Sequence, residues 1–333
     1  MKIKTKDLRY EEVLALPLEK HQNPMRQTGA VRLLLKAVSF FELRAVGFTF
    51  EKTGMEKPGA KEPCLILMNH SSFIDLKIVA TLLSDREYHI VCTQDGFVGK
   101  RLLMRLLGCI PSKKFINDIT LIKDMRYTLQ KLHASVLMYP EASYSFDGTE
   151  TPLPDSLGKC IKLLKVPVVM IRTSGAFLRD PLYNGLQLRN TKVSAKMEYL
   201  LSPEEIAEKS AGEINEILRN VFSFDYFKEQ QEQGILIKEP FRADGLQRAL
   251  YRCPHCQTEG MTEGKGTKLI CHACGISYEL SETGYLKADW GETHFSHIPD
   301  WYRWERECVR KELADGSYRL DLAVDIYMLT DTR

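Results

Sequence analysis

Two residues that can perform acid–base chemistry, His70 and Asp75, lie five positions apart in the segment NHSSFID, residues 69–75. The segment follows an apolar run, residues 64–68, that has the length and composition of a buried strand. We expect a helix to begin at one of the two serines, which would let the Asp75 carboxylate bind one imidazole nitrogen. The other nitrogen could then take a proton from a hydroxyl group. A capped, solvent-exposed pair has the same spacing, so the spacing alone does not establish catalysis.

Short apolar runs that alternate with helical segments must position this pair. The runs that we interpret as strands are Ala45 to Phe50, Cys64 to Asn69, His89 to Thr93, Ser135 to Tyr139 and Val166 to Ile171. One helix is expected after the capping residues Asn117 and Asp118, and another from Ser202 toward about residue 230. The alternation predicts an α/β fold with a largely parallel central sheet flanked by helices.

Three further segments follow in order: GCIPSKK at 108–114, YPEASYS at 139–145 and VPVV at 166–169. With His70 and Asp75, they make the chain resemble the glycerol-3-phosphate and 1-acylglycerol-3-phosphate acyltransferase family from about residue 40 to 225. The resemblance implies that a lipid hydroxyl attacks an acyl thioester, with His70 as the general base and Asp75 as its partner.

The resemblance also implies four substrate-binding residues, Lys113, Lys114, Glu141 and Tyr144. Lys114 stands at an arginine of the second family block, and Glu141 matches a glutamate of the third. Tyr144 departs from the family, which has an arginine implicated in binding the acceptor's phosphate there. Tyrosine has no charge and cannot form the bidentate contact of arginine. Either the lysines hold the phosphate or the acceptor is not the usual lysophosphatidic acid; Glu141 could instead satisfy backbone amides.

The implied function is transfer of an acyl group from acyl-CoA or acyl carrier protein to a lysophospholipid such as 1-acylglycerol-3-phosphate, in phospholipid biosynthesis. One alternative is acylation of a different lipid acceptor. Another is a non-catalytic lipid or acyl-carrier sensor, which the intact His70 and Asp75 disfavour because a sensor needs no base.

A second site is indicated by two Cys-x2-Cys pairs, Cys253 with Cys256 and Cys271 with Cys274, separated by 14 residues. This spacing is typical of zinc bound by four thiolates, and the module resembles a zinc ribbon. Four thiolates close the coordination shell, so we expect structural zinc. His255 and His272 are then bystanders. After the ribbon we expect a helix over 297–313 and a strand over 318–329.

Amphipathic and basic segments suggest a membrane partner. The stretch 31–41 predicts an N-terminal helix with a broad apolar face, which could equally pack in a core or lie in a membrane interface. Residues 97–131 contain eight Lys or Arg and two Asp, a net charge of +6, and include the apolar, basic stretch 100–107. Such a surface suits lipid headgroups.

The remaining composition limits the alternatives. Residues 240–333 carry 12 basic and 15 acidic residues, a net −3, so no nucleic-acid partner is expected. No signal peptide or membrane-spanning segment is expected, which predicts a cytoplasmic protein, peripheral on the inner face of the membrane. We expect N-terminal membrane-contacting helices over 1–44, an acyltransferase domain over 45–235, and the ribbon with its tail over 236–333.

Overall fold

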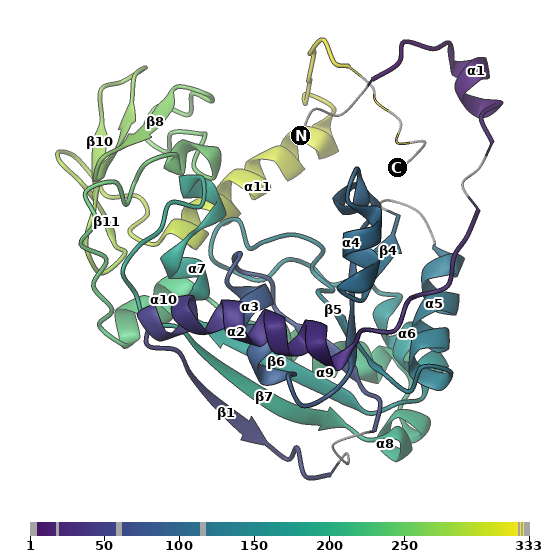
Figure 1. Cartoon of the computed structure of the whole chain (residues 1–333). Helices are drawn as coiled ribbons and strands as arrows, with labels where there is room; N and C mark the ends of the chain where they lie inside the picture. Colours follow the sequence, from purple (N-terminus) through teal and green to yellow (C-terminus); the bar gives the residue numbers. More distant parts are fainter. Residues whose placement is uncertain are drawn as a thin grey trace.

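A seven-stranded sheet forms the centre of the protein in this computed structural model, which describes residues 5–17, 20–57, 62–113, 118–325, 327 and 329 (Figure 1). Its strands are β1 (Thr49–Thr53), β2 (Leu65–Met68), β3 (Tyr88–Thr93), β4 (Cys109–Ser112), β5 (Ser135–Met138), β6 (Val168–Ser174) and β7 (Ser194–Leu201). They lie in the order β1-β7-β6-β2-β5-β3-β4. Only β6 and β7 pair antiparallel; the other neighbours are parallel.

Both faces of this sheet are covered because the central strands are apolar on both sides. In β2, Ile66 and Met68 pack with α2 (Gly29–Ala45) and α3 (Asp75–Leu82), while Leu65 and Leu67 face the opposite layer. That layer consists of α5 (Ile119–Gln130), α6 (Leu157–Leu164), α8 (Pro203–Glu208) and α9 (Ala211–Phe222). A strand buried on both faces is typical of parallel α/β sheets. The predicted α/β fold with a largely parallel sheet is confirmed.

The shorter elements connect these layers. They are the helices α1 (Tyr10–Leu14), α4 (Arg101–Leu106), α7 (Ala176–Arg179) and α10 (Tyr226–Glu232), and the 3-10 turns η1 (Gln94–Phe97), η2 (Leu182–Asn184) and η3 (Leu246–Arg248).

Several predicted boundaries were wrong. Helix α3 begins at Asp75 and not at the serines, because the amides of Ser71 and Ser72 bind the Asp75 carboxylate and a turn over Phe73 and Ile74 precedes the helix. The single helix expected from Ser202 to about 230 is three helices, because Ser210 and Asp225 each cap the start of a new helix. Strand β1 begins at Thr49, since α2 continues through the start of the expected strand.

Two strands of the sheet were not predicted. The edge strand β4 contains Pro111, which weakens the strand pattern but is tolerated where one side needs no partner. The antiparallel β7 mixes buried side chains with partly buried and charged ones, such as Lys196 and Glu198, and does not form an apolar run.

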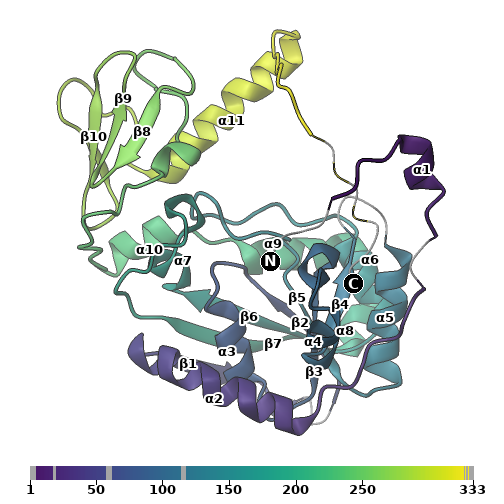
Figure 2. The ribbon, with the colours of Figure 1, turned by 45° about the horizontal axis from the view of Figure 1, so that its top comes forward.

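The C-terminal part forms a four-stranded antiparallel sheet followed by a long helix, α11 (Ile298–Asp315) (Figure 2). The strands are β8 (Thr262–Lys265), β9 (Lys268–Cys271), β10 (Ser277–Leu280) and β11 (Leu286–Ala288). The helix expected over 297–313 is confirmed. The expected strand over 318–329 is wrong: the residues described there form no strand and are exposed. The three-part division at residues 44 and 235 stays a prediction.

The N-terminal helix α2 is amphipathic but turns much of its apolar surface to solvent. Leu33, Leu34, Val38, Phe40 and Phe41 are all exposed, whereas only Ser39 and Leu43 are buried. No helix in the described ranges has the length and apolar content to cross a bilayer.

Candidate active site and metal centre

The candidate base His70 and two buried carboxyl side chains gather at the carboxyl edge of three adjacent strands. His70 follows β2, Glu141 follows β5, and Asp180 lies beyond β6 and the short helix α7. Strand β2 is hydrogen-bonded between β5 and β6, and all three run in parallel, so their carboxyl ends meet. Ligands of open α/β sheets bind outside this edge.

His70 and Asp75 form the predicted pair. Nδ1 of His70 lies 3.0 Å from Oδ2 of Asp75. The same carboxylate oxygen accepts hydrogen bonds from the backbone amides of Ser71 at 2.8 Å and Ser72 at 3.1 Å. Because an ionised carboxylate only accepts, Nδ1 carries the imidazole proton and Nε2 is left as an acceptor. The His70 side chain is 20% exposed and Asp75 is fully buried, so the base is reachable and its orienting partner is not.

Glu141 holds the backbone around this pair. Its Oε2 accepts from the amide of His70 at 3.0 Å, and its Oε1 accepts from the amide of Thr151 at 2.9 Å. The carboxyl is buried, and desolvation raises its pKa to about 7 against the opposing effect of the two amides. That Glu141 binds substrate stays a prediction; its contacts are those of a group that orients the His70 loop.

Two tyrosines of the third sequence block cover the His70 ring. Tyr139 stacks on it with ring centroids 3.9 Å apart, and Tyr144 lies tilted against it at 4.2 Å. Tyr144 also makes an edge contact with Phe73, which is exposed. Tyr144, where this chain differs from the family it resembles, therefore contacts the candidate base directly. Sequence reasoning missed Tyr139, although its place just before Pro140 and Glu141 put it in the block.

The loop that carries Tyr144 is held by the His70 loop. Ser145 donates its amide to the carbonyl of His70 at 2.9 Å, and its hydroxyl donates to the carbonyl of Thr149 at 2.7 Å, a turn contact. Ala142, where the family has glycine, has a φ of 59°, in the left-handed region that glycine adopts more easily.

Asp180 is a buried carboxyl that the sequence did not point out. It bonds the Ser72 side chain and Arg179, whose Nη1 lies 3.3 Å from Asp180 Oδ1. Burial raises its pKa to about 6. Arg179 also bonds Glu42 of α2 at 2.7 Å, so this network ties the N-terminal helix to the site. No local pattern marks Asp180, because only the fold brings it to the strand edge.

Lys113 and Lys114 are the two lysines expected to bind the acceptor's phosphate. Lys113 is exposed just after β4, and its amide donates to Asp118 Oδ2 at 2.9 Å; among the described residues, no hydrogen bond or ion pair links it to His70 or Tyr144. Lys114 lies outside the described residues. Their expected role in phosphate binding stays a prediction.

Behind His70, its two neighbours are fixed by a buried polar network. The amide nitrogen of Asn69 donates to the Thr173 hydroxyl at 3.0 Å and to the Tyr226 hydroxyl. The Ser71 hydroxyl lies 2.7 Å from that of Tyr226. Ser71 therefore supports the loop through its side chain.

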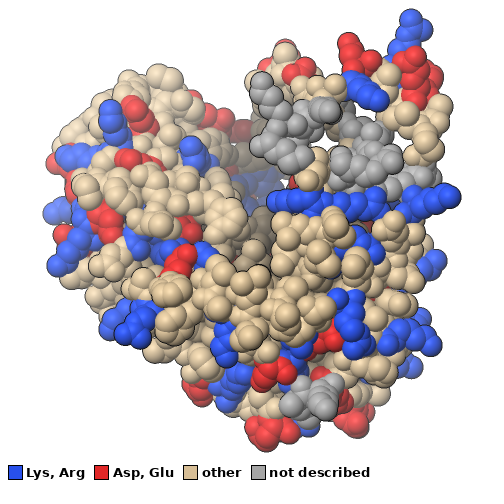
Figure 3. All heavy atoms as spheres, viewed as in Figure 1, with Lys and Arg blue, Asp and Glu red and all other residues tan. Residues whose placement is uncertain are grey.

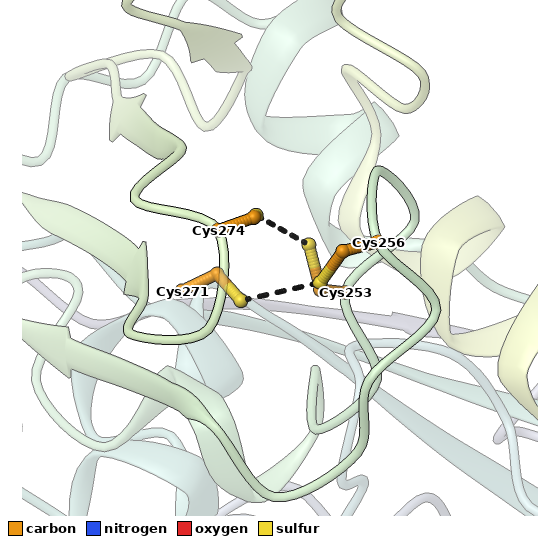
Figure 4. A group of neighbouring side chains, drawn as sticks. All are labelled: Cys253, Cys256, Cys271 and Cys274. Carbon is orange, nitrogen blue, oxygen red and sulfur yellow. Dashed lines mark hydrogen bonds between the residues drawn. The ribbon is translucent and has the colours of Figure 1, made fainter.

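The four paired cysteines form a compact group in the C-terminal module (Figure 4). Their sulfur atoms all lie within 4.8 Å of one another; Cys253 is 3.8 Å from Cys274, and Cys256 is 3.7 Å from Cys271. A tetrahedron with metal–sulfur bonds of about 2.3 Å has edges of about 3.8 Å, so these spacings fit one metal ion bound by four thiolates. They are far too long for disulfides.

The two cysteine turns have matching backbones. The residue after each pair, Gln257 or Gly275, has a left-handed φ of 64° or 77° and donates its amide to the carbonyl of the first cysteine. His272 bonds Glu263 at 2.8 Å and His255 contacts Trp290, so neither belongs to the sulfur group.

Apolar side chains also gather on the surface near the site. Figure 3 shows a broad uncharged area over α2 and α4, with Lys and Arg side chains at its borders. Its exposed apolar residues on α4 are Leu102, Leu103 and Leu106. Phe73 and Leu76, which lie next to the candidate catalytic pair in the sequence, are also exposed.

Residues 49–174 match the family model described as Acyltransferase. The match runs from β1 to the end of β6 and contains His70, Asp75, Glu141 and Tyr144, but not the cysteine module. Among solved structures, the 1-acyl-sn-glycerophosphate (LPA) acyltransferase PlsC from Thermotoga maritima is similar over 57% of this chain and 76% of that chain, with 15% identity and a TM-score of 0.46.

Proposed function

We propose that this protein, whose residues 49–174 match the Acyltransferase family model, transfers an acyl group from acyl-CoA or acyl carrier protein to a lysophospholipid hydroxyl, such as that of 1-acylglycerol-3-phosphate, in phospholipid biosynthesis. The observation that carries the proposal is the partly exposed His70 imidazole, whose Nδ1 is bound by the buried Asp75. A lipid or acyl-carrier sensor would have no use for an oriented base.

In the proposed reaction, the acceptor hydroxyl donates a hydrogen bond to Nε2 of His70. As its oxygen attacks the thioester carbonyl carbon, the proton moves to Nε2 and Asp75 stabilises the imidazolium. The C–O bond of the new ester forms, the C–S bond breaks, and the imidazolium returns its proton to the departing sulfur. Glu141, by holding the His70 amide, and Tyr139, by stacking on the ring, keep the imidazole oriented.

A second candidate function is acylation of an acceptor without a phosphate group. Tyr144 supports it, because its uncharged ring lies against His70 where an arginine would otherwise supply a cation. In the first candidate, Lys113 and Lys114 supply that charge; in the second, Tyr144 and the exposed Phe73 contact apolar parts of the acceptor.

The metal of the C-terminal module is proposed to be zinc, bound by Cys253, Cys256, Cys271 and Cys274. The spacing of the four sulfurs supports it, as does the preference of zinc for tetrahedral thiolate sites. A closed shell of four thiolates makes the metal a structural cross-link that keeps the two cysteine turns together.

The lysophospholipid acceptor of the proposed reaction reaches the site from a bilayer. The exposed apolar residues of α2 and α4 with their basic borders suit peripheral binding to anionic lipid, proposed for the inner face of the membrane in the cytoplasm. A core-packing role for α2 would leave Phe41 and Leu33 buried, whereas both are exposed.

The deciding experiment incubates the purified protein with labelled acyl-CoA and acyl carrier protein donors, each with a panel of lysophospholipids and monoacylglycerol. Labelled phosphatidic acid as the main product supports the first function, and labelled diacylglycerol the second. Donor binding without any acylated product would reject both and favour a sensor.

A further inference from the structure

Helix α10 lies between the catalytic loop and the C-terminal module in both views (Figures 1 and 2). At its start, Tyr226 is buried, and its hydroxyl contacts the Ser71 hydroxyl and the amide nitrogen of Asn69. These two residues flank His70 in the sequence. The Tyr226 amide also donates to the carbonyl of Gly148, in the loop that follows Tyr144, at 2.8 Å. One residue of α10 thus supports both loops of the candidate site.

The same helix is held by the C-terminal module. Asp225, which caps α10, bonds Nε2 of His297 at 2.7 Å, at the start of α11. The buried Gln230 donates to the carbonyl of Glu282 at 2.9 Å. Tyr226 belongs to one apolar cluster with Cys253, Cys271 and Trp301, so the contact between α10 and the module is continuous buried core.

Helix α11 carries the connection to the metal site. Its Trp301 donates to the carbonyl of Arg252 at 2.9 Å, and its Glu305 accepts from the amide of Arg252 at 2.7 Å. Arg252 directly precedes the ligand Cys253. On another side of the helix, Tyr302 makes an edge contact with Phe146, two residues after Tyr144, at a centroid distance of 5.8 Å.

We propose that the metal-loaded C-terminal module braces the active site, with Tyr226 as the positioning residue that fixes the two neighbours of His70. This inference rests on the proposed acyl transfer. When metal links the cysteine turns, Arg252 is fixed, α11 is anchored, and α10 is held against both loops. When the link is lost, the support behind Asn69 and Ser71 loosens, and the imidazole samples orientations that cannot take the acceptor's proton.

The first test replaces Tyr226→Phe, which keeps the ring in its stack with Phe177 and removes only the hydroxyl. We expect kcat to fall roughly 10- to 100-fold with KM changed less than about 3-fold, because orientation and not substrate contact is lost. Tyr278→Phe is the matched control. Tyr278 is equally buried in the same cluster, and its hydroxyl has no partner among the described residues.

Equal kcat values for Tyr226→Phe and Tyr278→Phe would overturn the proposal, because any effect would then belong to the cluster and not to the Tyr226 hydroxyl. A loss confined to KM in Tyr226→Phe would also overturn it.

The second test measures hydrogen–deuterium exchange of the full chain before and after metal chelation, and after zinc is restored. We expect faster exchange, reversed by zinc, at residues 69–76 and 141–149 as well as in the module, while α5 on the far side of the sheet stays protected. Exchange that rises only within residues 240–315 would overturn the brace. If α5 also loses protection, the chain unfolds as a whole and the Tyr226→Phe comparison decides.

These outcomes separate the two proposals. If the wild type forms no acylated lipid with any donor, the proposed function fails, and the exchange measurements still decide whether the module braces the His70 loop. Suppose instead that the wild type is active, that exchange at residues 69–76 does not change when the metal is removed, and that Tyr226→Phe keeps its kcat. Only the bracing proposal then fails.

Discussion

The Tyr144 ring lies against the imidazole of His70, with centroids 4.2 Å apart, at the position where the resembled family has an arginine. The side chain at this position therefore brings no positive charge for an acceptor's phosphate. Whatever recognises a phosphate must come from elsewhere in the chain.

If the acceptor is phosphorylated, Lys114→Ala should erode the preference for lysophosphatidic acid over monoacylglycerol more than Tyr144→Phe does. A charge-assisted contact is worth roughly 1.5 to 3 kcal/mol, against about 1 for a neutral hydrogen bond. Kinetics on both acceptors measure the preference, and Lys113→Ala serves as the neighbouring comparison. Equal losses on the two acceptors would assign Lys114 to folding or to the donor, and a wild-type preference for monoacylglycerol would support the second function.

His70→Ala should abolish acyl transfer without unfolding the protein, since loss of a positioned base typically costs roughly 100- to 10,000-fold in rate. Asp75→Asn should also be severe, because the amide can no longer fix the Nδ1–H tautomer. Initial rates of thioester cleavage with saturating acceptor measure both, and circular dichroism checks the fold. A folded His70→Ala variant with nearly normal turnover would reject the mechanism.

Metal analysis should find about one zinc per chain, with four sulfur ligands by X-ray absorption. Cys253→Ser should lose the zinc and make the segment from Ile235 onward sensitive to protease first. Cys308→Ser is the matched control, since Cys308 is not one of the four grouped sulfurs. A full equivalent of zinc and unchanged protease resistance in Cys253→Ser would contradict the metal site.

Glu305→Gln should make stability less dependent on pH. Glu305 is fully buried, and burial raises its pKa from 4.5 to about 8, so the native state binds more protons than the unfolded chain between these values. Stability therefore falls as pH rises through this window, by about 2 kcal/mol between pH 6 and 8. Glutamine keeps an acceptor for the Arg252 amide but cannot ionise.

Urea unfolding at pH 6 and pH 8 gives the measurement. The variant should gain stability relative to wild type as pH rises, while Glu141 and Asp180, whose pKa values are also raised, contribute equally to both proteins. A constant difference at the two pH values would mean that Glu305 does not ionise in this range.

Ala142→Gly should stabilise the protein by up to about 1 kcal/mol. Ala142 has a φ of 59° and an exposed side chain, so glycine relieves roughly 1 to 2 kcal/mol of left-handed strain and loses no packing. The greater conformational entropy that glycine gives the unfolded chain offsets about 0.4 to 1 kcal/mol of this stabilisation. Thermal unfolding checks this, with Ala207→Gly in helix α8 as a control that should destabilise. A lower melting temperature for Ala142→Gly would contradict the strain argument.

The sequence determined those features that depend on neighbours along the chain. Apolar runs predicted most parallel strands because a strand buried on both faces needs apolar residues throughout. The five-residue spacing of His70 and Asp75 allowed their contact, since a single turn spans it. The spacing of the cysteine pairs predicted their grouping for a similar reason: each pair fits one tight turn, and a short hairpin brings the two turns together.

Tertiary structure alone decided what surrounds those features. Tyr139, Tyr226 and Asp180 reach the site from segments far apart in the chain, through the order of strands β6, β2 and β5 and through α10. No local pattern encodes such contacts, because side chains that meet at a sheet edge are set by which strands pair. The apolar face of α2 shows the same limit, because its sequence fitted either a buried or an exposed helix. In the structure the opposite side of α2 packs on α3 and the sheet, and Phe41 is therefore exposed to solvent.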